Sequence, residues 1–530
     1  MINWHEHVTL PAMRTETHFD GRTLSCFADR PASFYAMFAQ AVASAPEHEA
    51  LSCNGERWTY AQVEREVTRI AAGLSMRGIV AGERVLMFIS NKPEFVFMLY
   101  ALQKIGAIAV PVGTREQGPG LTYILNQCGA AGVVFDSELA DRIPAADAVP
   151  ALRLRITIGA TPVAGAHALA DLNGPAAPAV AVNEADCAVI LYTSGTTGKP
   201  KGAMLTHFNI AHSVIHFEIC LQLSAQDRAA LAVPASHVTG LIALIATIVH
   251  VGGTLVILPE FKAADFVALA ARERISYSLL VPAMYQLCLL QPAFREVDLS
   301  HWRIGGFGGA PMPAATVDTL RATVPGLTLV NCYGSTETTS PATIMPLGLT
   351  AAHNDSVGVA VPCATIKVVD ANGQPVAAGE SGELWIGGPM VVPGYWDNPD
   401  ATANGFADGC WRSGDLGSLD AQGLVRIFDR IKDMINRGGF KIYSVEVENT
   451  IMGMAGVIEA AVVGQPCPVL GERVHAHVYA PNSALDAAAV RAYCATQLAD
   501  YKVPEQIIFV DTPLPRNPNG KVLKRQLRTT

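Results

Sequence analysis

The segment AVILYTSGTTGKPKG, residues 188–202, joins an apolar run to a loop dense in glycine, hydroxyl and lysine residues. The run Ala188–Leu191 is typical of a buried strand. Glycines let the backbone approach an anion closely, while hydroxyls, backbone N–H groups and lysines can hold phosphate oxygens. A flexible polar turn is the alternative, but such turns rarely carry this composition directly after a buried strand. The segment predicts a phosphate-binding loop, whose candidate contacts are Thr193, Ser194, Gly195, Thr196, Thr197, Gly198 and Lys199.

The loop differs from the Walker A motif, which needs four residues between its glycines and Ser or Thr after its lysine. Here only Thr196 and Thr197 separate Gly195 from Gly198, and Pro200 follows Lys199. A phosphate loop of another class is therefore expected.

Strands and helices alternate on the amino-terminal side of this loop. Residues 85–89, 107–112 and 133–135 are short apolar runs, and residues 93–105 have a helical pattern between them. Strand–helix–strand units of this kind build parallel sheets with helices on both faces. Residues 160–183, rich in Ala and Pro, are predicted to be a surface connection.

The pattern changes toward the carboxyl end. Residues 366–370 and 383–386 flank turns and predict a smaller antiparallel β subdomain, and the chain from about residue 429 reads as a separate α+β unit. The expected fold class is α/β. It comprises a large N-terminal domain, residues 1–428, with two parallel-type subdomains and a β subdomain, and a small mobile C-terminal α+β domain, residues 429–530.

One segment, residues 241–258, is almost long and apolar enough for a membrane span. His250 and the pair Gly252–Gly253 interrupt it, and residues 254–258 read as a strand. We expect a buried helix, a glycine turn and a buried strand, and no membrane span.

The composition narrows the functional class. The 530 residues carry a formal net charge of −9, which disfavours a nucleic-acid polymer as the main partner because phosphate neutralisation needs a basic face. The eleven cysteines form no C-x-x-C pair, so neither a disulfide framework nor a zinc site is indicated. The first residues lack the basic-then-apolar order of a signal peptide, and a cytoplasmic location is expected.

A second segment, NCYGSTE at residues 331–337, gathers groups that suit a nucleotide and a metal ion. Tyr333 offers a ring face on which adenine can stack, and Asn331 can pair with the exocyclic amine. Thr336 can donate to a phosphate, and Glu337 is a hard oxygen ligand suited to Mg²⁺. For Glu337 a solvated loop carboxylate is the alternative.

Both segments resemble signature motifs of the adenylate-forming superfamily, which includes acyl-CoA synthetases, peptide-synthetase adenylation domains and beetle luciferases. The resemblance continues in order across nearly the whole chain. At residues 411–415 the sequence WRSGD stands where the family has T-G-D, so Ser413 replaces a threonine, a conservative change. The further matching segments are residues 233–240, 308–311, 429–441 and 514–524.

The resemblance implies a role for each matching residue. Asp415 would accept hydrogen bonds from both ribose hydroxyls, and Arg430 would contact the ribose and phosphate region. Lys521 would bridge the carboxylate and the α-phosphate, while His237 would border the acyl pocket, although a satisfied core histidine is the alternative. The implied adenine contacts are Gly309, Ala310, Pro311, Asn331, Tyr333 and Gly334, and the implied metal ligands are Glu337 and Thr196.

The C-terminal unit carries two active segments, which cannot occupy one site together. One is Lys521, and the other is the loop of Gly438, Gly439 and Lys441, which the resemblance places along the pantetheine tunnel. Rotation about a hinge at Lys432 would present them in turn.

The implied activity is that of an AMP-forming acyl-CoA synthetase, which uses ATP, Mg²⁺ and coenzyme A. Residues 241–246 after His237 and residues 340–342 carry no basic side chain, so we expect a monocarboxylic acid with an apolar tail, fatty or aryl. Alternatives are an adenylating enzyme that loads a carrier protein, a luciferase-like oxidase and a non-catalytic AMP sensor. The sequence leaves monomer and homodimer open.

Overall fold

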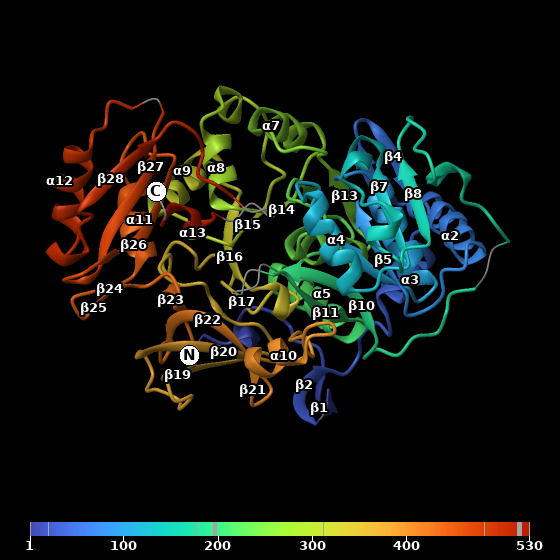
Figure 1. Ribbon diagram of the computed structural model, residues 1–530, viewed down its shortest axis with the longest axis horizontal. Coiled ribbons are helices and arrows are strands. Elements are labelled where there is room, and N and C mark those ends of the chain that lie inside the picture. Colours follow the sequence, from blue (N-terminus) through green and yellow to red (C-terminus); the bar gives the residue numbers. More distant parts are fainter. Residues whose placement is uncertain are drawn as a thin grey trace.

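A computed structural model describes residues 2–19, 21–175, 178–193, 199–310, 312–481, 483–516 and 522–528 of the chain. Its first α/β subdomain is built on a seven-stranded sheet in the order β11-β10-β6-β5-β7-β8-β9, parallel except for the β10–β11 pair (Figure 1). The strands are β5 Arg84–Phe88, β6 Ile108–Pro111, β7 Gly132–Asp136, β8 Leu154–Ile158, β9 His167–Ala168, β10 Cys187–Thr193 and β11 Lys201–Thr206.

The second subdomain is a nine-stranded sheet in the order β18-β17-β16-β15-β14-β12-β13-β3-β4. Its central strands are parallel, and antiparallel strands close both edges. The strands are β3 Glu49–Cys53, β4 Glu56–Thr59, β12 Arg228–Leu231, β13 Thr254–Ile257, β14 Tyr277–Leu280, β15 Ile304–Phe307, β16 Thr328–Tyr333, β17 Thr343–Ile344 and β18 Val359–Ala360.

Helices cover both faces of the first sheet. Successive strand residues point to opposite faces, and apolar residues at successive positions therefore need a covering layer on each face. In β5, Val85 and Met87 face the main core, whereas Leu86 and Phe88 face a second core with α4. Helix α3 is buried along nearly its whole length within the main core, which residues of both sheets share. The helices of this part are α1 Phe34–Ser44, α2 Tyr60–Met76, α3 Pro93–Lys104, α4 Gly118–Gln127, α5 His207–Leu221, α7 Ala263–Arg272, α8 Pro282–Leu289 and α9 Ala314–Thr323.

The apolar segment of residues 241–258 folds as the sequence predicts. A π-helix spans Thr239–Ala246, helix α6 spans Thr247–His250, and the glycine turn leads into β13. Residues 241–246 are fully buried in the main core. Among the described residues, no helix is long and apolar enough to cross a membrane.

The connection at residues 160–183 is less superficial than the sequence predicts. It contains β9, which pairs with β8, and a 3-10 helix Leu169–Asp171. Leu169 and Leu172 are buried in the main core. Their apolar side chains, spaced among Ala and Pro, anchor a segment whose composition alone indicates a loop.

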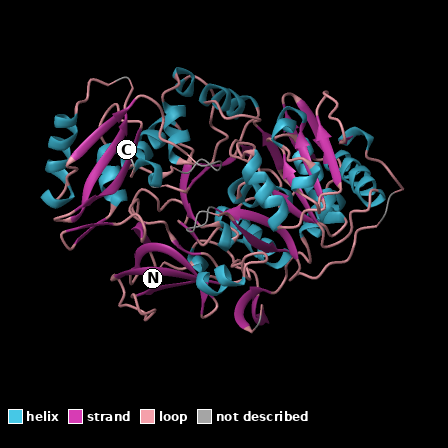
Figure 2. Cartoon of the chain, viewed as in Figure 1, coloured by secondary structure: helices cyan, strands magenta, loops and turns pink. Residues whose placement is uncertain are grey.

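The β subdomain and the C-terminal unit follow (Figure 2). In the β subdomain, β19 Thr365–Val369, β20 Ser381–Gly387, β21 Phe406–Ala407, β22 Cys410–Leu419 and β23 Val425–Arg430 pair antiparallel, as predicted, with α10 Pro399–Gly405 beside them. The C-terminal unit has its own core. Its elements are β24 Ile435–Arg437, β25 Phe440–Ile442, α11 Ser444–Met452, β26 Glu459–Cys467, β27 Gly471–Tyr479, α12 Ala487–Gln497, β28 Gln506–Val510 and α13 Lys524–Leu527. A hairpin of β1 Met13–His18 and β2 Arg22–Phe27 lies near the start of the chain.

Candidate active site

The carboxylate of Glu337 is the centre of one half of the site. Glu337 is only 6 % exposed and lies in the 3-10 helix Thr336–Thr338, just beyond the end of β16. Its Oε1 accepts hydrogen bonds from the hydroxyls of Tyr395 at 2.9 Å and Thr193 at 3.4 Å. Its Oε2 accepts from Ser335 at 2.7 Å. Neutral hydroxyls therefore orient this charge, and in the described part of the chain no salt bridge neutralises it.

Thr193 brings the phosphate-binding segment to this carboxylate. It is the last residue of β10, so the chain enters residues 194–198 directly beside Glu337. Ser194, Gly195, Thr196, Thr197 and Gly198 lie outside the described residues. Beyond them, the ammonium of Lys199 lies 5.8 Å from the ring centroid of Tyr123. The phosphate loop is thus anchored, at one end, on the predicted metal-binding residue.

Tyr395 is a site residue that the sequence did not identify. The backbone of residues 394–396 lies against β11, since Met204 N donates to the Gly394 carbonyl and Trp396 N donates to the Gly202 carbonyl. This places the Tyr395 ring 4.9 Å from the ammonium of Lys201 and its hydroxyl on Glu337. The only local signal is an aromatic pair after glycine, GYW at residues 394–396, which has many structural uses.

The second half of the site surrounds Asp415. Strands β22 and β23 pair so that Asp415 lies directly opposite Arg430. Arg430 Nε lies 2.6 Å from Asp415 Oδ1, and the Tyr333 hydroxyl donates to Oδ2 at 2.6 Å. Burial and the Asp415 carboxylate raise the pKa of Tyr333 well above its usual value. The phenol therefore remains a hydrogen-bond donor, and the tertiary structure brings Tyr333, Asp415 and Arg430 together.

The adenine-side residues follow the carboxyl ends of β15 and β16. Asn331 Nδ2 donates to the Ser356 carbonyl at 3.2 Å, which directs the amide so that its oxygen remains an acceptor for an exocyclic amine. Gly309 has φ +75°, and Ala310 is exposed. A side chain on Gly334 would press on the backbone of residues 340–342. Pro311 lies outside the described residues.

His237 lies at the start of the π-helix. Its Nδ1 is 3.1 Å from Thr239 Oγ1 and accepts from Thr239 N at 3.2 Å. Because Nδ1 accepts from a backbone N–H, the ring has its proton on Nε2 when it is neutral. The apolar residues 241–246 continue directly behind it.

Of the two predicted C-terminal segments, the structure describes the loop of Gly438, Gly439 and Lys441. Gly438 and Gly439, with φ +60° and +91°, form the tip of the β24–β25 hairpin, and Lys441 is exposed on β25. Both positive φ values explain glycine at these two positions. In the view of Figure 1 this hairpin lies at the outer margin of the C-terminal unit, whereas α13 lies toward β16. Lys521 lies outside the described residues, and Lys432 is exposed in the turn between β23 and β24.

The residues present fit ATP and Mg²⁺. Mg²⁺ prefers carboxylate oxygens, and the buried charge of Glu337 is oriented by hydroxyls without a salt-bridge partner among the described residues. Asp415 offers two acceptor oxygens in fixed positions for a vicinal diol. These are the groups that would hold the metal and the ribose.

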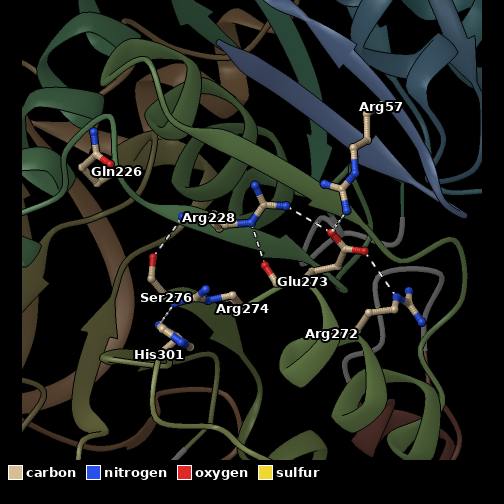
Figure 3. Close-up of a pocket in the computed structure, with 8 residues that line it drawn as sticks. All are labelled: Arg57, Gln226, Arg228, Arg272, Glu273, Arg274, Ser276 and His301. Atoms are coloured by element: carbon tan, nitrogen blue, oxygen red, sulfur yellow. Dashed lines mark hydrogen bonds and ion pairs between the residues drawn. The ribbon is translucent and has the colours of Figure 1, made fainter.

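A separate cavity of about 400 Å³ lies at the amino ends of β12 and β14, the opposite edge of the nine-stranded sheet from Tyr333 (Figure 3). Three of its arginines pair with Glu273, whose side chain is 3 % exposed: Arg57 at 2.8 Å, Arg228 at 3.1 Å and Arg272 at 3.3 Å. The group is an internal ion network that joins α7 to β4 and β12. It contains none of the predicted site residues.

Comparison with known proteins agrees with this site. A family described as "AMP-binding enzyme" matches residues 38–396, and one described as "AMP-binding enzyme C-terminal domain" matches residues 446–521. A feruloyl-CoA synthase from Amycolatopsis sp is 35 % identical over 91 % of this chain and 96 % of its own length. A long-chain-fatty-acid–CoA ligase from Mycobacterium tuberculosis is 35 % identical over 89 % of this chain and 93 % of its own length.

A solved structure, the anthranilate CoA ligase in complex with anthranoyl-AMP, superposes with a TM-score of 0.88 at 26 % identity and covers 94 % of this chain and 96 % of that one. The fold and the paired carboxylate sites define an adenylate-forming enzyme, and the chain belongs to the AMP-binding enzyme family. Within that class it is an AMP-forming acyl-CoA synthetase, an acid–thiol ligase.

Proposed function

We propose that this ligase activates a monocarboxylic acid with an apolar tail, fatty or aryl, and that the residues named above perform the chemistry. The observation that supports the tail preference is the fully buried apolar π-helix behind His237. A second carboxylate at the far end of a substrate would need a basic partner, and residues 241–246 offer none. The matched relatives include both an aryl-acid and a fatty-acid ligase.

The first half-reaction is attack of the substrate carboxylate on the α-phosphate of ATP. It forms a mixed anhydride between the acid and AMP and releases pyrophosphate, so the enzyme needs no covalent nucleophile. Asn331 and Tyr333 hold adenine, Asp415 accepts the ribose hydroxyls, and Arg430 stays beside them through its ion pair with Asp415. These contacts align the attacking and leaving oxygens, which is the main route to catalysis of phosphoryl and adenylyl transfer.

Glu337 and Thr336 act on the phosphate side. Glu337, with Thr196, would hold Mg²⁺, which neutralises charge on the phosphate oxygens when bound. The hydroxyls of Tyr395 and Ser335 keep the Glu337 carboxylate pointed toward the chain of Thr193. Thr336 and Lys521 donate to the α-phosphate region, where negative charge builds in the transition state.

In the second half-reaction the thiolate of coenzyme A attacks the acyl carbon and AMP leaves. We propose that Gly438, Gly439 and Lys441 line the path of the pantetheine arm and reach the site by rotation at Lys432. The turn of residues 431–433 between β23 and β24 supports this hinge. Pairing of β22 with β23 continues through Arg430, so the division between the two domains is proposed in that turn rather than at 428/429.

We also propose a cytoplasmic location. All eleven cysteines are free thiols, and nine of them are buried, which suits a reducing compartment.

The test is pyrophosphate release over a panel of acids, each measured with and without coenzyme A. Acids with apolar tails should release pyrophosphate, and coenzyme A should convert the adenylate to thioester and raise turnover. A preference for dicarboxylic acids would contradict the proposed tail specificity. Turnover that needs an acyl-carrier protein instead of coenzyme A would contradict the proposed acceptor.

A further inference from the structure

A series of contacts connects the strand before the proposed hinge to helix α13, at the end of the described chain. On one side is Asp429, the penultimate residue of β23, which is 2 % exposed. Its Oδ2 accepts from the backbone N–H of Ser444, the first residue of α11. This hydrogen bond connects the strand before the turn of residues 431–433 to the first helix after it.

The side chain of Lys524 extends this contact to α13. Its ammonium lies 2.7 Å from Ser444 Oγ and 2.6 Å from Glu448 Oε1. Both side chains of the ion pair are largely buried, at 16 % exposure for Lys524 and 12 % for Glu448. Burial raises the pKa of Asp429 and that of Glu448, and the nearby Lys524 opposes both shifts. The Lys524 ammonium thus forms an ion pair with Glu448 and also stabilises the charged form of Asp429 electrostatically.

The other end of α13 reaches the hinge turn itself. The guanidinium of Arg528, which follows α13, donates to the Lys432 carbonyl at 2.9 Å and lies 3.4 Å from Asp433 Oδ1. We call Lys524 and Arg528, with their partners Ser444, Glu448, Lys432 and Asp433, the α13 clasp. These contacts hold α13 in place. A helix of only four residues is too short to be stable by itself.

The sequence places Lys521 only three residues before Lys524. We propose that Lys524 is a positioning residue for the adenylation half-reaction, which fastens the chain that follows Lys521 to α11. Because Asp429 lies before the hinge turn and Ser444 after it, rotation at Lys432 breaks the Asp429–Ser444 bond. The Lys524–Glu448 pair lies wholly after the turn and moves as one body. This inference rests on the proposed role of Lys521.

The experiment compares Lys524→Met with wild type in the two half-reactions separately. Adenylation is followed by ATP–pyrophosphate exchange, and thioester formation by AMP release from supplied acyl-AMP and coenzyme A. Misplacement of a catalytic group by about 1 Å costs about 100-fold in rate, so the exchange kcat should fall by that order while the ATP KM stays within about twofold. Thioester formation should keep its rate, and Lys524→Arg should restore most of the exchange activity.

The matched control is Lys502→Met. Lys502 is a second lysine of the C-terminal unit, nearly as little exposed as Lys524, and pairs at 2.7 Å with Glu446, which is 38 % exposed. Removal of this pair, which in the described part of the chain does not contact α13, should leave both half-reactions unchanged. Arg528→Gln cuts the other end of the clasp and should reduce exchange selectively as well. Equal loss of both half-reactions in Lys524→Met and Arg528→Gln, with a lower melting temperature, would show a merely structural role and overturn the proposal. The wild-type enzyme is measured in the same ATP–pyrophosphate exchange assay. If the proposed function is wrong and the enzyme adenylates no acid, the wild type itself shows no exchange, which distinguishes that failure from failure of the Lys524 proposal.

Discussion

The hydroxyl of Tyr395 lies 2.9 Å from Oε1 of Glu337, although 58 residues separate the two in the chain. Both side chains are 6 % exposed, and the ammonium of Lys201 lies behind the tyrosine ring at 4.9 Å. A buried carboxylate held by neutral donors is stabilised without being neutralised, so it retains its charge for a cation. We therefore propose that Tyr395 orients Glu337 for Mg²⁺ at the phosphate site.

Tyr395→Phe removes the hydroxyl and keeps the ring over Lys201. The lost hydrogen bond to a charged group corresponds to about 1.5–3 kcal/mol, or roughly 10- to 150-fold. We expect this loss in the adenylation rate at limiting Mg²⁺, with partial recovery at high Mg²⁺, measured by pyrophosphate release in a Mg²⁺ titration. Tyr285→Phe is the control, at a buried tyrosine of α8 whose hydroxyl donates to the Gly306 carbonyl. An unchanged Mg²⁺ dependence in Tyr395→Phe would contradict the proposed role of Tyr395 in orienting Glu337.

Asp415→Asn should weaken ATP binding. The amide offers one acceptor oxygen in place of two and cannot pair with both Arg430 and the ribose diol. The KM for ATP should rise by about ten- to 100-fold, as for loss of a charged hydrogen bond. The control is Asp420→Asn, which removes a carboxylate paired with Arg426 in the same subdomain. Equal KM values in the two variants would contradict the ribose role.

Lys432→Pro should impair the switch of the enzyme from adenylation to thioester formation. Proline fixes φ near −65° and so restricts the turn of residues 431–433, where the rotation is proposed. Nucleotide binding, measured by calorimetry, should remain, while steady-state thioester formation falls. Lys432→Ala removes the same side chain without the restriction and should retain turnover. Wild-type rates for both half-reactions in Lys432→Pro would exclude a hinge at this residue.

Three buried histidines on α5 should make the fold acid-sensitive. Burial lowers the pKa of His207 to about 4 and those of His212 and His216 to about 3, below the ordinary histidine pKa of about 6.5. As pH falls, these histidines take up protons in the unfolded chain before they do so in the folded protein. Their contribution therefore leaves the free energy of unfolding at its full value above about pH 6.5 and lowers it below that pH. Each histidine contributes a slope of up to about 1.4 kcal/mol per pH unit.

The measurement is the free energy of unfolding by urea between pH 8 and pH 5. His216→Phe replaces a ring that contacts Phe27 edge-on and should reduce the slope by one histidine's share. A slope that is the same in His216→Phe and wild type would show that other groups take up the protons.

Glu273→Gln should lower the stability of the fold and leave catalysis almost unchanged. It leaves Arg57 and Arg228 without their shared buried carboxylate (Figure 3). Both arginines keep Glu49 as a second partner, so loss of their hydrogen bonds to Glu273 should cost about 1.5–3 kcal/mol and lower the melting temperature. The kcat at 25 °C should stay within about twofold, because the network lies at the edge of the sheet opposite Tyr333. A large drop in kcat of the folded variant would contradict this separation.

The sequence alone predicted elements and chemistry wherever the information is local. The strand of residues 188–191, the helix and strand within residues 241–258 and the antiparallel pairing of residues 366–370 with 383–386 are confirmed. Periodicity and glycine placement act within a few residues, so they are readable from the chain. Tyr333, Glu337 and Asp415 could be proposed as site residues for the same reason, since their motifs are contiguous, and their roles stay predictions.

Tertiary structure decided what depends on residues far apart in the chain. Packing of residues 394–396 against β11 recruited Tyr395 to Glu337, and register between β22 and β23 set Arg430 opposite Asp415. Lys524 lies in a basic stretch, residues 521–525, whose composition gives no sign of burial, yet its side chain is largely buried against Glu448. A side chain's partners depend on the enclosing elements, and these long-range contacts leave no mark in the local pattern from which the motifs were read.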